Sequence, residues 1–149
     1  MRDIPRPALF LGLAGLVPFL WGAITMLHPP LGDWGRGALG PRFVGPYVGL
    51  FYGTVILSFM SGVLWGFATR LSGSAATLGY AASVVPALWA FFMVGGGPEG
   101  SALSLIAGFT LILGLDWAFW RAGLAPPWWL HLRVMLTAVV VPSLATVLI

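Results

Sequence analysis

The stretch PYVGLFYGTVILSFMSGVLWGFAT, residues 46–69, decides the fold of this chain. It contains no charged residue. A helix needs about 20 mostly apolar residues to cross about 30 Å of hydrocarbon, and this stretch is longer than that. Four other runs are also apolar and long enough to cross a membrane, although the last two each contain one charged residue: 8–27, 76–95, 101–120 and 128–149. The sequence therefore predicts an all-α integral membrane protein with five transmembrane helices, forming one membrane domain over residues 1–149.

The composition excludes several other classes of protein. Charged residues make up 7% of the chain and hydrophobic residues 59%, so five spans leave only short connections and no room for a soluble domain. The net charge of +3 comes from arginines scattered at helix ends, with no lysine, which argues against a nucleic-acid partner. The absence of cysteine excludes disulfides and thiolate chemistry.

The distribution of arginine predicts the topology. Helices that follow one another across a membrane place alternate connections on the same side. Arg2, Arg6, Arg70, Arg121 and Arg133 fall on the N-terminal side, whereas Arg36 and Arg42 fall on the other. Because positive residues are enriched in cytoplasmic connections, we expect a cytoplasmic or matrix-side N-terminus and an outer C-terminus. The first run is too long for a cleaved signal and is read as a retained helix.

One connection, residues 28–45, is long, rich in glycine and proline, and lies on the predicted outer side. It is interpreted as a solvated or interfacial loop, with a partner-binding loop or a lid as the alternative. Three tryptophans, Trp34, Trp128 and Trp129, fall at the predicted membrane interfaces. Indole rings commonly anchor helices at headgroup level, so we expect these three to be interfacial anchors.

Two pairs of short segments resemble one another. VPFLW at 17–21 is echoed by VPALW at 85–89, and GVLWGF at 62–67 by GLDWAF at 114–119. A genuine duplication would make the first four helices two parallel hairpin repeats, with the fifth helix left over. Coincidence and shared packing demands remain the alternative, because apolar sequences of low diversity often match over such lengths.

Small residues are spaced by four along the second predicted helix: Thr54, Ser58, Gly62 and Gly66. Helices in lipid associate through close backbone approach and interhelical hydrogen bonds, and such a stripe favours both. Packing within the chain is the simplest expectation. A second copy or a foreign subunit would use the same stripe.

Asp116 is the one carboxylate within a predicted span and is the main candidate for chemistry. Ionisable groups in spans usually face the protein interior and pair with another group. Arg133 is the favoured partner because the adjacent antiparallel helix brings it to a similar depth. Arg70 and His131 lie on the same side and are further candidates. A structural ion pair that joins helices four and five is one interpretation, and a proton relay or ligand site is the other.

No pattern of catalytic or metal-binding residues is present. The chain lacks a zinc-protease motif, a nucleophile elbow, a phosphate loop and an acidic cluster. His28 and His131 lie on opposite sides in the predicted topology, so they cannot ligate one haem together. We therefore expect no enzyme activity, no metal and no cofactor, although a quinone or a lipid would need only a cleft and one or two polar contacts.

Several segments together resemble a known family. GLVPF at 15–19, YGTVILSF at 52–59, Asp116 and the Leu132-Arg133 pair are similar to a family of small membrane proteins of unknown function. That family is shared by proteobacteria and mitochondria and includes vertebrate transmembrane protein 69. The resemblance implies an inner-membrane location, no established reaction or partner, and pattern positions at Asp116 and Arg133. The translocator-protein family also has five helices and many tryptophans, but its Trp/Pro-rich first loop is absent.

Two functions are consistent with these observations. An accessory subunit or assembly factor of a larger energy-converting complex would explain the small extramembrane parts and the small-residue stripe. A small transporter or a binder of a lipophilic ligand, such as a quinone or porphyrin, would explain Asp116. The expected partners are membrane lipids together with other membrane subunits or a second copy. Arginine without lysine and the richness in alanine, glycine and leucine favour a bacterial over a mitochondrial inner membrane.

Overall fold

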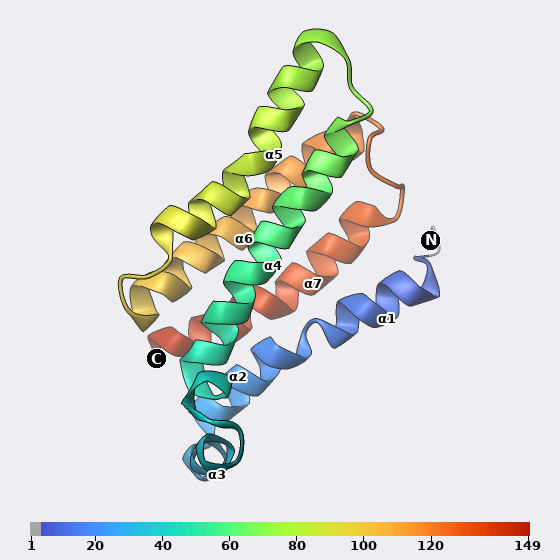
Figure 1. The fold of residues 1–149 in the computed structure, drawn as a ribbon. Coiled ribbons are helices and arrows are strands. Elements are labelled where there is room, and N and C mark those ends of the chain that lie inside the picture. The colour runs from blue at the N-terminus through green and yellow to red at the C-terminus, as the bar shows by residue number, and fades with distance from the viewer. Residues whose placement is uncertain (1–3) are drawn as a thin grey trace.

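The computed structural model describes residues 4–149, and that part of the chain is helical with short connections (Figure 1). The α-helices are α1 Arg6–Ala14, α2 Val17–Leu27, α3 Pro29–Leu39, α4 Gly45–Ala68, α5 Gly73–Met93, α6 Pro98–Arg121 and α7 Trp129–Ala145. Two 3₁₀ turns, η1 Pro41–Phe43 and η2 Thr146–Leu148, follow α3 and α7.

The five predicted spans are confirmed. The helices long and apolar enough to cross a membrane are Arg6–Leu27, Gly45–Ala68, Gly73–Met93, Pro98–Arg121 and Trp129–Leu148. Their ends differ from the predicted ends by a few residues, and the middle three begin at Gly45, Gly73 and Pro98, residues that the apolar pattern does not mark. An odd number of spans places the two ends of the chain on opposite sides, and Figure 1 shows the start of α1 and the end of α7 at opposite ends of the bundle. Arg2, part of the predicted charge bias, lies outside the described residues.

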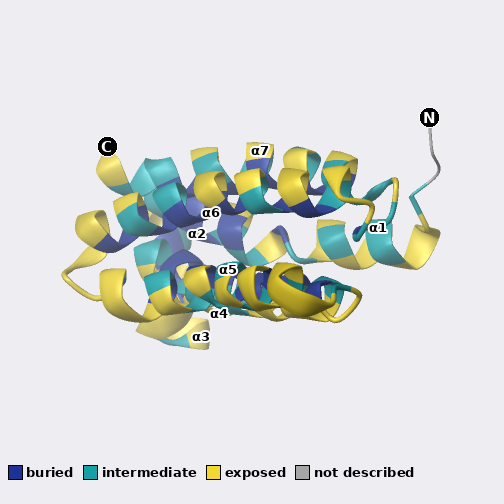
Figure 2. Cartoon of the chain, turned by 90° about the horizontal axis from the view of Figure 1, so that it is seen from above, coloured by how far each residue is buried: buried dark blue, intermediate teal, exposed yellow. Residues whose placement is uncertain are grey.

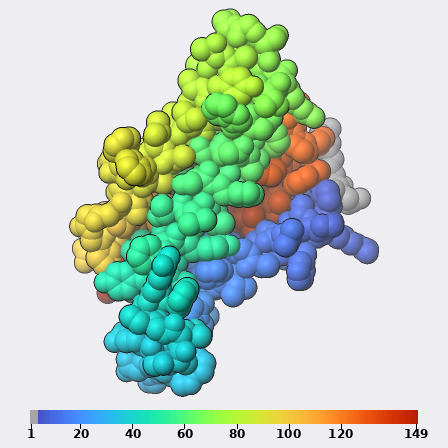
Figure 3. Space-filling model, in the orientation of Figure 1, coloured from blue at the N-terminus to red at the C-terminus, as the bar shows by residue number. Residues whose placement is uncertain are grey.

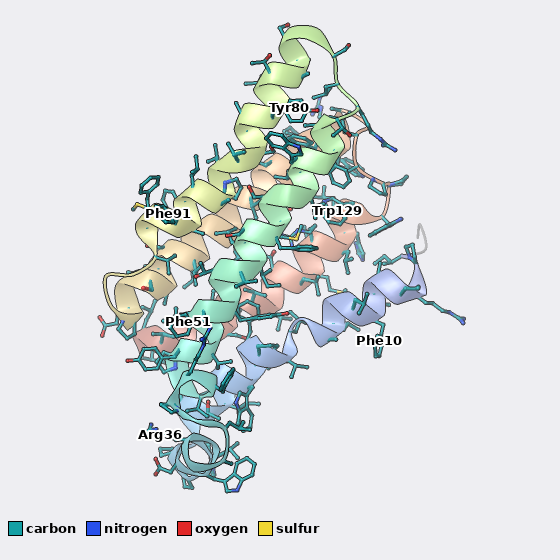
Figure 4. The ribbon with its side chains drawn as sticks, viewed as in Figure 1. Phe10, Arg36, Phe51, Tyr80, Phe91 and Trp129 are labelled. Atoms are coloured by element: carbon teal, nitrogen blue, oxygen red, sulfur yellow. The ribbon has the colours of Figure 1, made fainter. Side chains whose placement is uncertain are left out.

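The core lies between the pair α4 and α5 and the pair α6 and α7 (Figure 2). Leu57 and Leu64 of α4 are fully buried there, and they pack in one cluster with Leu105 and Phe109 of α6. The outer faces are apolar as well. Phe10 and Phe91, for example, point away from the bundle (Figure 4), and both are largely exposed. Large apolar side chains outside the bundle are what a lipid environment requires.

The first span is broken in two. Pro18 is the second residue of α2, and its ring would clash with the carbonyl of Ala14, where α1 ends. The backbone therefore passes from α1 to α2 through Gly15 and Leu16. No residue of α1 is buried, and Figure 1 shows α1 as the most peripheral of the membrane-spanning segments.

The long connection 28–45 is a helix followed by a 3₁₀ turn, which corrects the expectation of a loop. The side chain of His28 accepts a hydrogen bond from the backbone N–H of Leu31, and the prolines that follow it open α3. Proline is favoured in a first helical turn because its missing N–H would have no partner there. The segment after α3 is held to α2, since the indole of Trp21 donates to the carbonyl of Phe43 at 2.7 Å.

Candidate functional site: a buried ion pair beside an apolar cavity

Asp116 lies on the buried stripe of α6. The stripe has the three- and four-residue spacing of a helix face and consists of Leu105, Phe109, Ile112, Asp116 and Phe119. The Asp116 side chain has no exposed surface. A carboxylate thus lies in the core on a helix face whose neighbouring turns carry large apolar side chains. It needs hydrogen-bond donors from another helix.

The first two turns of α7 supply those donors. Arg133 Nε donates to Asp116 Oδ2 at 2.9 Å, and Trp129 Nε1 donates to Oδ1 at 2.7 Å. Trp129 and Arg133 are four residues apart, so they lie on the same face of the helix. Arg133 is itself only 5% exposed. The structure therefore brings Asp116 and Arg133 together as a buried ion pair in which each carboxylate oxygen has one donor.

Trp129 has a role that the sequence did not predict. It was expected to be an interfacial anchor, yet its indole N–H is bonded to a buried carboxylate, and its ring packs edge-on against Phe67 of α4, with ring centroids 5.3 Å apart. Figure 4 shows Trp129 between α4 and α7. The signal that would have found it is the spacing of four residues between Trp129 and Arg133.

The other predicted partners of Asp116 lie elsewhere. Arg70 donates from Nη1 to the carbonyl of Leu124 at 2.9 Å, which ties the end of α4 to the connection between α6 and α7. His131 is exposed. Of the two other predicted interfacial anchors, Trp128 is half-buried against Trp129, and Trp34 is 62% exposed on α3.

The small-residue stripe of α4 does not pack uniformly within the chain. Thr54 and Ser58 are half-buried, and their hydroxyls donate to carbonyls four residues earlier in α4. Gly62 and Gly66 are exposed, and an added Cβ at either position would meet nothing within 4 Å. The expected packing within the chain therefore fails at these two glycines. The buried face of α4 is a different face of the helix, which contains Gly53 and not Gly62.

Two buried polar atoms near the ion pair have no hydrogen-bond partner among the described residues. They are Nη2 of Arg133 and Oγ1 of Thr137, one turn further along α7. Hydroxyls within helices usually bond to the carbonyl four residues earlier, as Ser143 does in the same helix at 2.8 Å. Thr137 does not, although its side chain is buried. Buried polar atoms without partners are uncommon and need an explanation.

Both atoms belong to residues that line a cavity of 370 Å³. Its walls come from α1, α2, α4, α6 and α7, and among residues 4–149 Arg133 is the only charged residue that lines it. Apart from Arg133, Thr137, Tyr52 and two tryptophans, the lining side chains are apolar. In Figure 3 the surface is recessed between α4, in green, and α1, in blue, and part of α7 is visible there in red. The volume lies within the range of about 300–1,000 Å³ that is typical of ligand pockets.

The paired sequence segments occupy similar environments. Leu64 of α4 and Asp116 of α6 take the same place in the two segments, and both are fully buried. The tryptophans that follow them, Trp65 and Trp117, are 49% and 48% exposed. These equivalent positions thus face the same way in α4 and α6, and the core that the two helices share holds leucine at one of them and a carboxylate at the other.

A family model matches residues 4–149, almost the whole chain. The description of that family is a protein of unknown function, DUF3429. This chain belongs to that family. No solved structure matches the chain. Among residues 4–149, no group of three or more His, Asp or Glu side chains is placed to hold a metal ion.

Two vertebrate relatives are similar along the whole chain. Transmembrane protein 69 of Xenopus tropicalis is 35% identical over 153 residues, and transmembrane protein 69 of Mus musculus is 29% identical over 157 residues. The match covers 100% of this chain in both comparisons, but 56% of the frog protein and 58% of the mouse protein. The chain thus spans little more than half the length of these relatives. With the spans described above, it is a multi-pass membrane protein of a family of unknown function.

Proposed function

We propose that this chain is a non-enzymatic membrane protein that holds a lipophilic ligand between α1, α4 and α7. The observation that carries the proposal is the pair of buried, unpartnered polar groups on α7, Arg133 Nη2 and Thr137 Oγ1, whose residues line a 370 Å³ apolar cavity. A ligand with an apolar body and one polar atom would fill the cavity and bond to these groups. Binding, rather than transport, is what one cavity beside one ion pair supports.

Asp116 has a positioning role in this proposal. Both of its oxygens already accept hydrogen bonds, from Arg133 and Trp129. The Asp116 side chain has no exposed surface and is not among the residues that line the cavity, so a ligand there meets Arg133 and not the carboxylate. The carboxylate instead fixes the guanidinium of Arg133, whose Nη2 is left without a partner.

The proposal is tested by what co-purifies with the protein. Wild type and two variants are purified from bacterial membranes in mild detergent, extracted with organic solvent and compared by mass spectrometry. Ile56→Trp adds an indole at a half-buried position on the cavity wall. The matched control is Val55→Trp, at an adjacent position that is 63% exposed on the outer face.

We expect one lipophilic compound to co-purify in near-stoichiometric amount with wild type and with Val55→Trp. Ile56→Trp should lose this compound while its thermal unfolding midpoint stays unchanged. Wild type that carries only the bulk lipid mixture, or Ile56→Trp that retains the lipophile, would contradict the proposal.

A second function is supported by the exposed part of the α4 stripe. We propose that the protein is also an accessory subunit or assembly factor of a larger energy-converting complex of the bacterial inner membrane, and that the partner helix docks at Gly62 and Gly66. Both glycines are exposed, so the backbone of another helix can approach closely. A second copy of the chain is the other occupant that this surface would accept.

Native gel electrophoresis tests the docking proposal. Gly62→Leu and Gly66→Leu should shift the protein from a large complex to its own mass, because leucine keeps the partner backbone away. Gly114→Leu, at an exposed glycine of α6 with nothing within 4 Å of an added Cβ, is the control and should leave the complex intact. Wild type that migrates at the mass of one chain would contradict the proposal.

A further inference from the structure

We infer that the head of the bound ligand is a neutral hydrogen-bond acceptor, such as a quinone or ester carbonyl, and not an anion. This inference rests on the proposed function, because it names the chemical class that the same cavity selects. A quinone and a lipid ester share the relevant chemistry, a carbonyl oxygen on a long apolar body.

The first step concerns hydrogen-bond polarity. A guanidinium has only donors, so the free Nη2 of Arg133 requires an acceptor. The hydroxyl of Thr137, which is also unpartnered, can donate to the same oxygen. The two residues are four apart on α7, which places them on one face of the helix. An acceptor oxygen between them would satisfy both groups.

The second step concerns charge. The single positive charge of Arg133 is balanced by Asp116 at 2.9 Å, and no other described residue that lines the cavity is charged. The site is therefore neutral before a ligand enters. A carboxylate head would bring an uncompensated negative charge into a region of low dielectric constant, next to Asp116, and such a charge is costly to bury. A carbonyl carries no such cost.

The third step concerns depth. With a rise of about 1.5 Å per residue, Arg133 and Thr137 lie about 6 and 12 Å along α7 from Trp129 at its start. These residues thus lie one and two turns inside the apolar span that begins at Trp129, among lining side chains such as Leu136 and Val140. A zwitterionic or phosphate headgroup would have to leave the interface to reach them, whereas a quinone ring or the carbonyl of a buried ester would not.

The test compares three probes on the purified protein in detergent by equilibrium binding: a benzoquinone with a decyl tail, a long-chain fatty acid methyl ester, and the parent fatty acid, at about pH 9 where the acid is ionised. We expect the quinone and the ester to bind at least about tenfold more tightly than the acid, a difference of about 1.4 kcal/mol. The tighter of the two neutral probes identifies the source as quinone or lipid.

Thr137→Val keeps the shape of the side chain and removes the hydroxyl. It should weaken the neutral probes about fivefold, the effect of one hydrogen bond. Thr110→Val is the control, because Thr110 is exposed on α6 and bonds to the carbonyl of Ile106; it should change nothing.

The outcomes separate this inference from the proposed function. Acid binding as tight as ester binding, or neutral probes unaffected by Thr137→Val, would overturn the ligand class while the cavity remains a binding site. Failure of all three probes to bind would overturn both.

Discussion

At the scale of single residues, the chain places a full charge where the matching segment has leucine. Asp116 corresponds to Leu64, and both are fully buried. A buried ion pair contributes little net stability compared with an apolar pair of the same size, but removing one partner is costly. The pair therefore matters less for holding α6 to α7 than for fixing the direction of the Arg133 side chain.

The ion pair predicts a non-additive mutant cycle. Asp116→Asn and Arg133→Gln should each lower the free energy of unfolding in detergent by about 3–5 kcal/mol, because each leaves one buried charge without its partner. The double variant should recover part of that loss, since no charge remains unpaired. Additive losses in the double variant would show that the two side chains do not interact.

The Trp129 hydrogen bond predicts a second, smaller effect. Trp129→Phe removes a 2.7 Å bond to a charged oxygen and should cost about 1.5–3 kcal/mol of unfolding free energy. Trp34→Phe, at an indole that is 62% exposed on α3, should change the stability by less than about 0.5 kcal/mol. Equal effects of the two substitutions in the same unfolding assay would show that Trp129 acts only as an interfacial anchor.

At the scale of helices, two glycines of α6 differ in the space around them. An added Cβ at Gly108 would lie 2.5 Å from Cδ2 of Leu57 and 3.1 Å from Cδ1 of Trp89, whereas an added Cβ at Gly114 would meet nothing within 4 Å. Leu57 is fully buried, so it has no room to move aside. The packing of α6 against α4 and α5 thus depends on Gly108.

This contrast gives a matched pair of substitutions. Gly108→Ala should destabilise the protein by about 1–3 kcal/mol through overpacking. Gly114→Ala should be neutral or stabilising by up to about 1 kcal/mol, because alanine is the better helix former. The check is the thermal midpoint of each purified variant, and a Gly108→Ala protein as stable as wild type would contradict the described contact of α6 with Leu57.

The sequence predicts the spans well, because length and apolarity alone define them. It does not predict which face of each helix is buried, because both faces are apolar when one of them meets lipid. For that reason the α4 stripe was expected to pack inside, whereas Gly62 and Gly66 are exposed. The ion pair was foreseeable, since a lone carboxylate in a span needs a partner. The cavity was not, because it depends on the break at Pro18 and the position of α1.

At the scale of the whole molecule, the predicted orientation is open to a direct check. The chain contains no cysteine, so single cysteines report their own side of the membrane. Gly37→Cys on α3 and Ala122→Cys after α6 are both exposed positions. A membrane-impermeant maleimide should label Gly37→Cys in intact bacterial spheroplasts and Ala122→Cys only after permeabilisation. The opposite pattern would place the N-terminus outside.

The cavity depends on the fold of the whole chain, because helices from both ends of the chain line it. The first span, broken after Ala14, adds α1 as a peripheral wall with no buried residue of its own. Between that wall and the rest of the bundle lies the cavity, which is lined by Arg133 and Thr137, the two residues of α7 with unpartnered polar atoms.

The most direct test of a ligand site in this cavity is to map where a lipophilic probe attaches to the protein. A benzoquinone with a diazirine in its tail is activated by light on the purified protein, and the modified residues are identified by mass spectrometry. We expect adducts on cavity-lining residues such as Leu132 and Leu136, which an excess of the unlabelled quinone abolishes. Adducts spread over exposed outer positions such as Phe91, with no competition, would contradict a ligand site in this cavity.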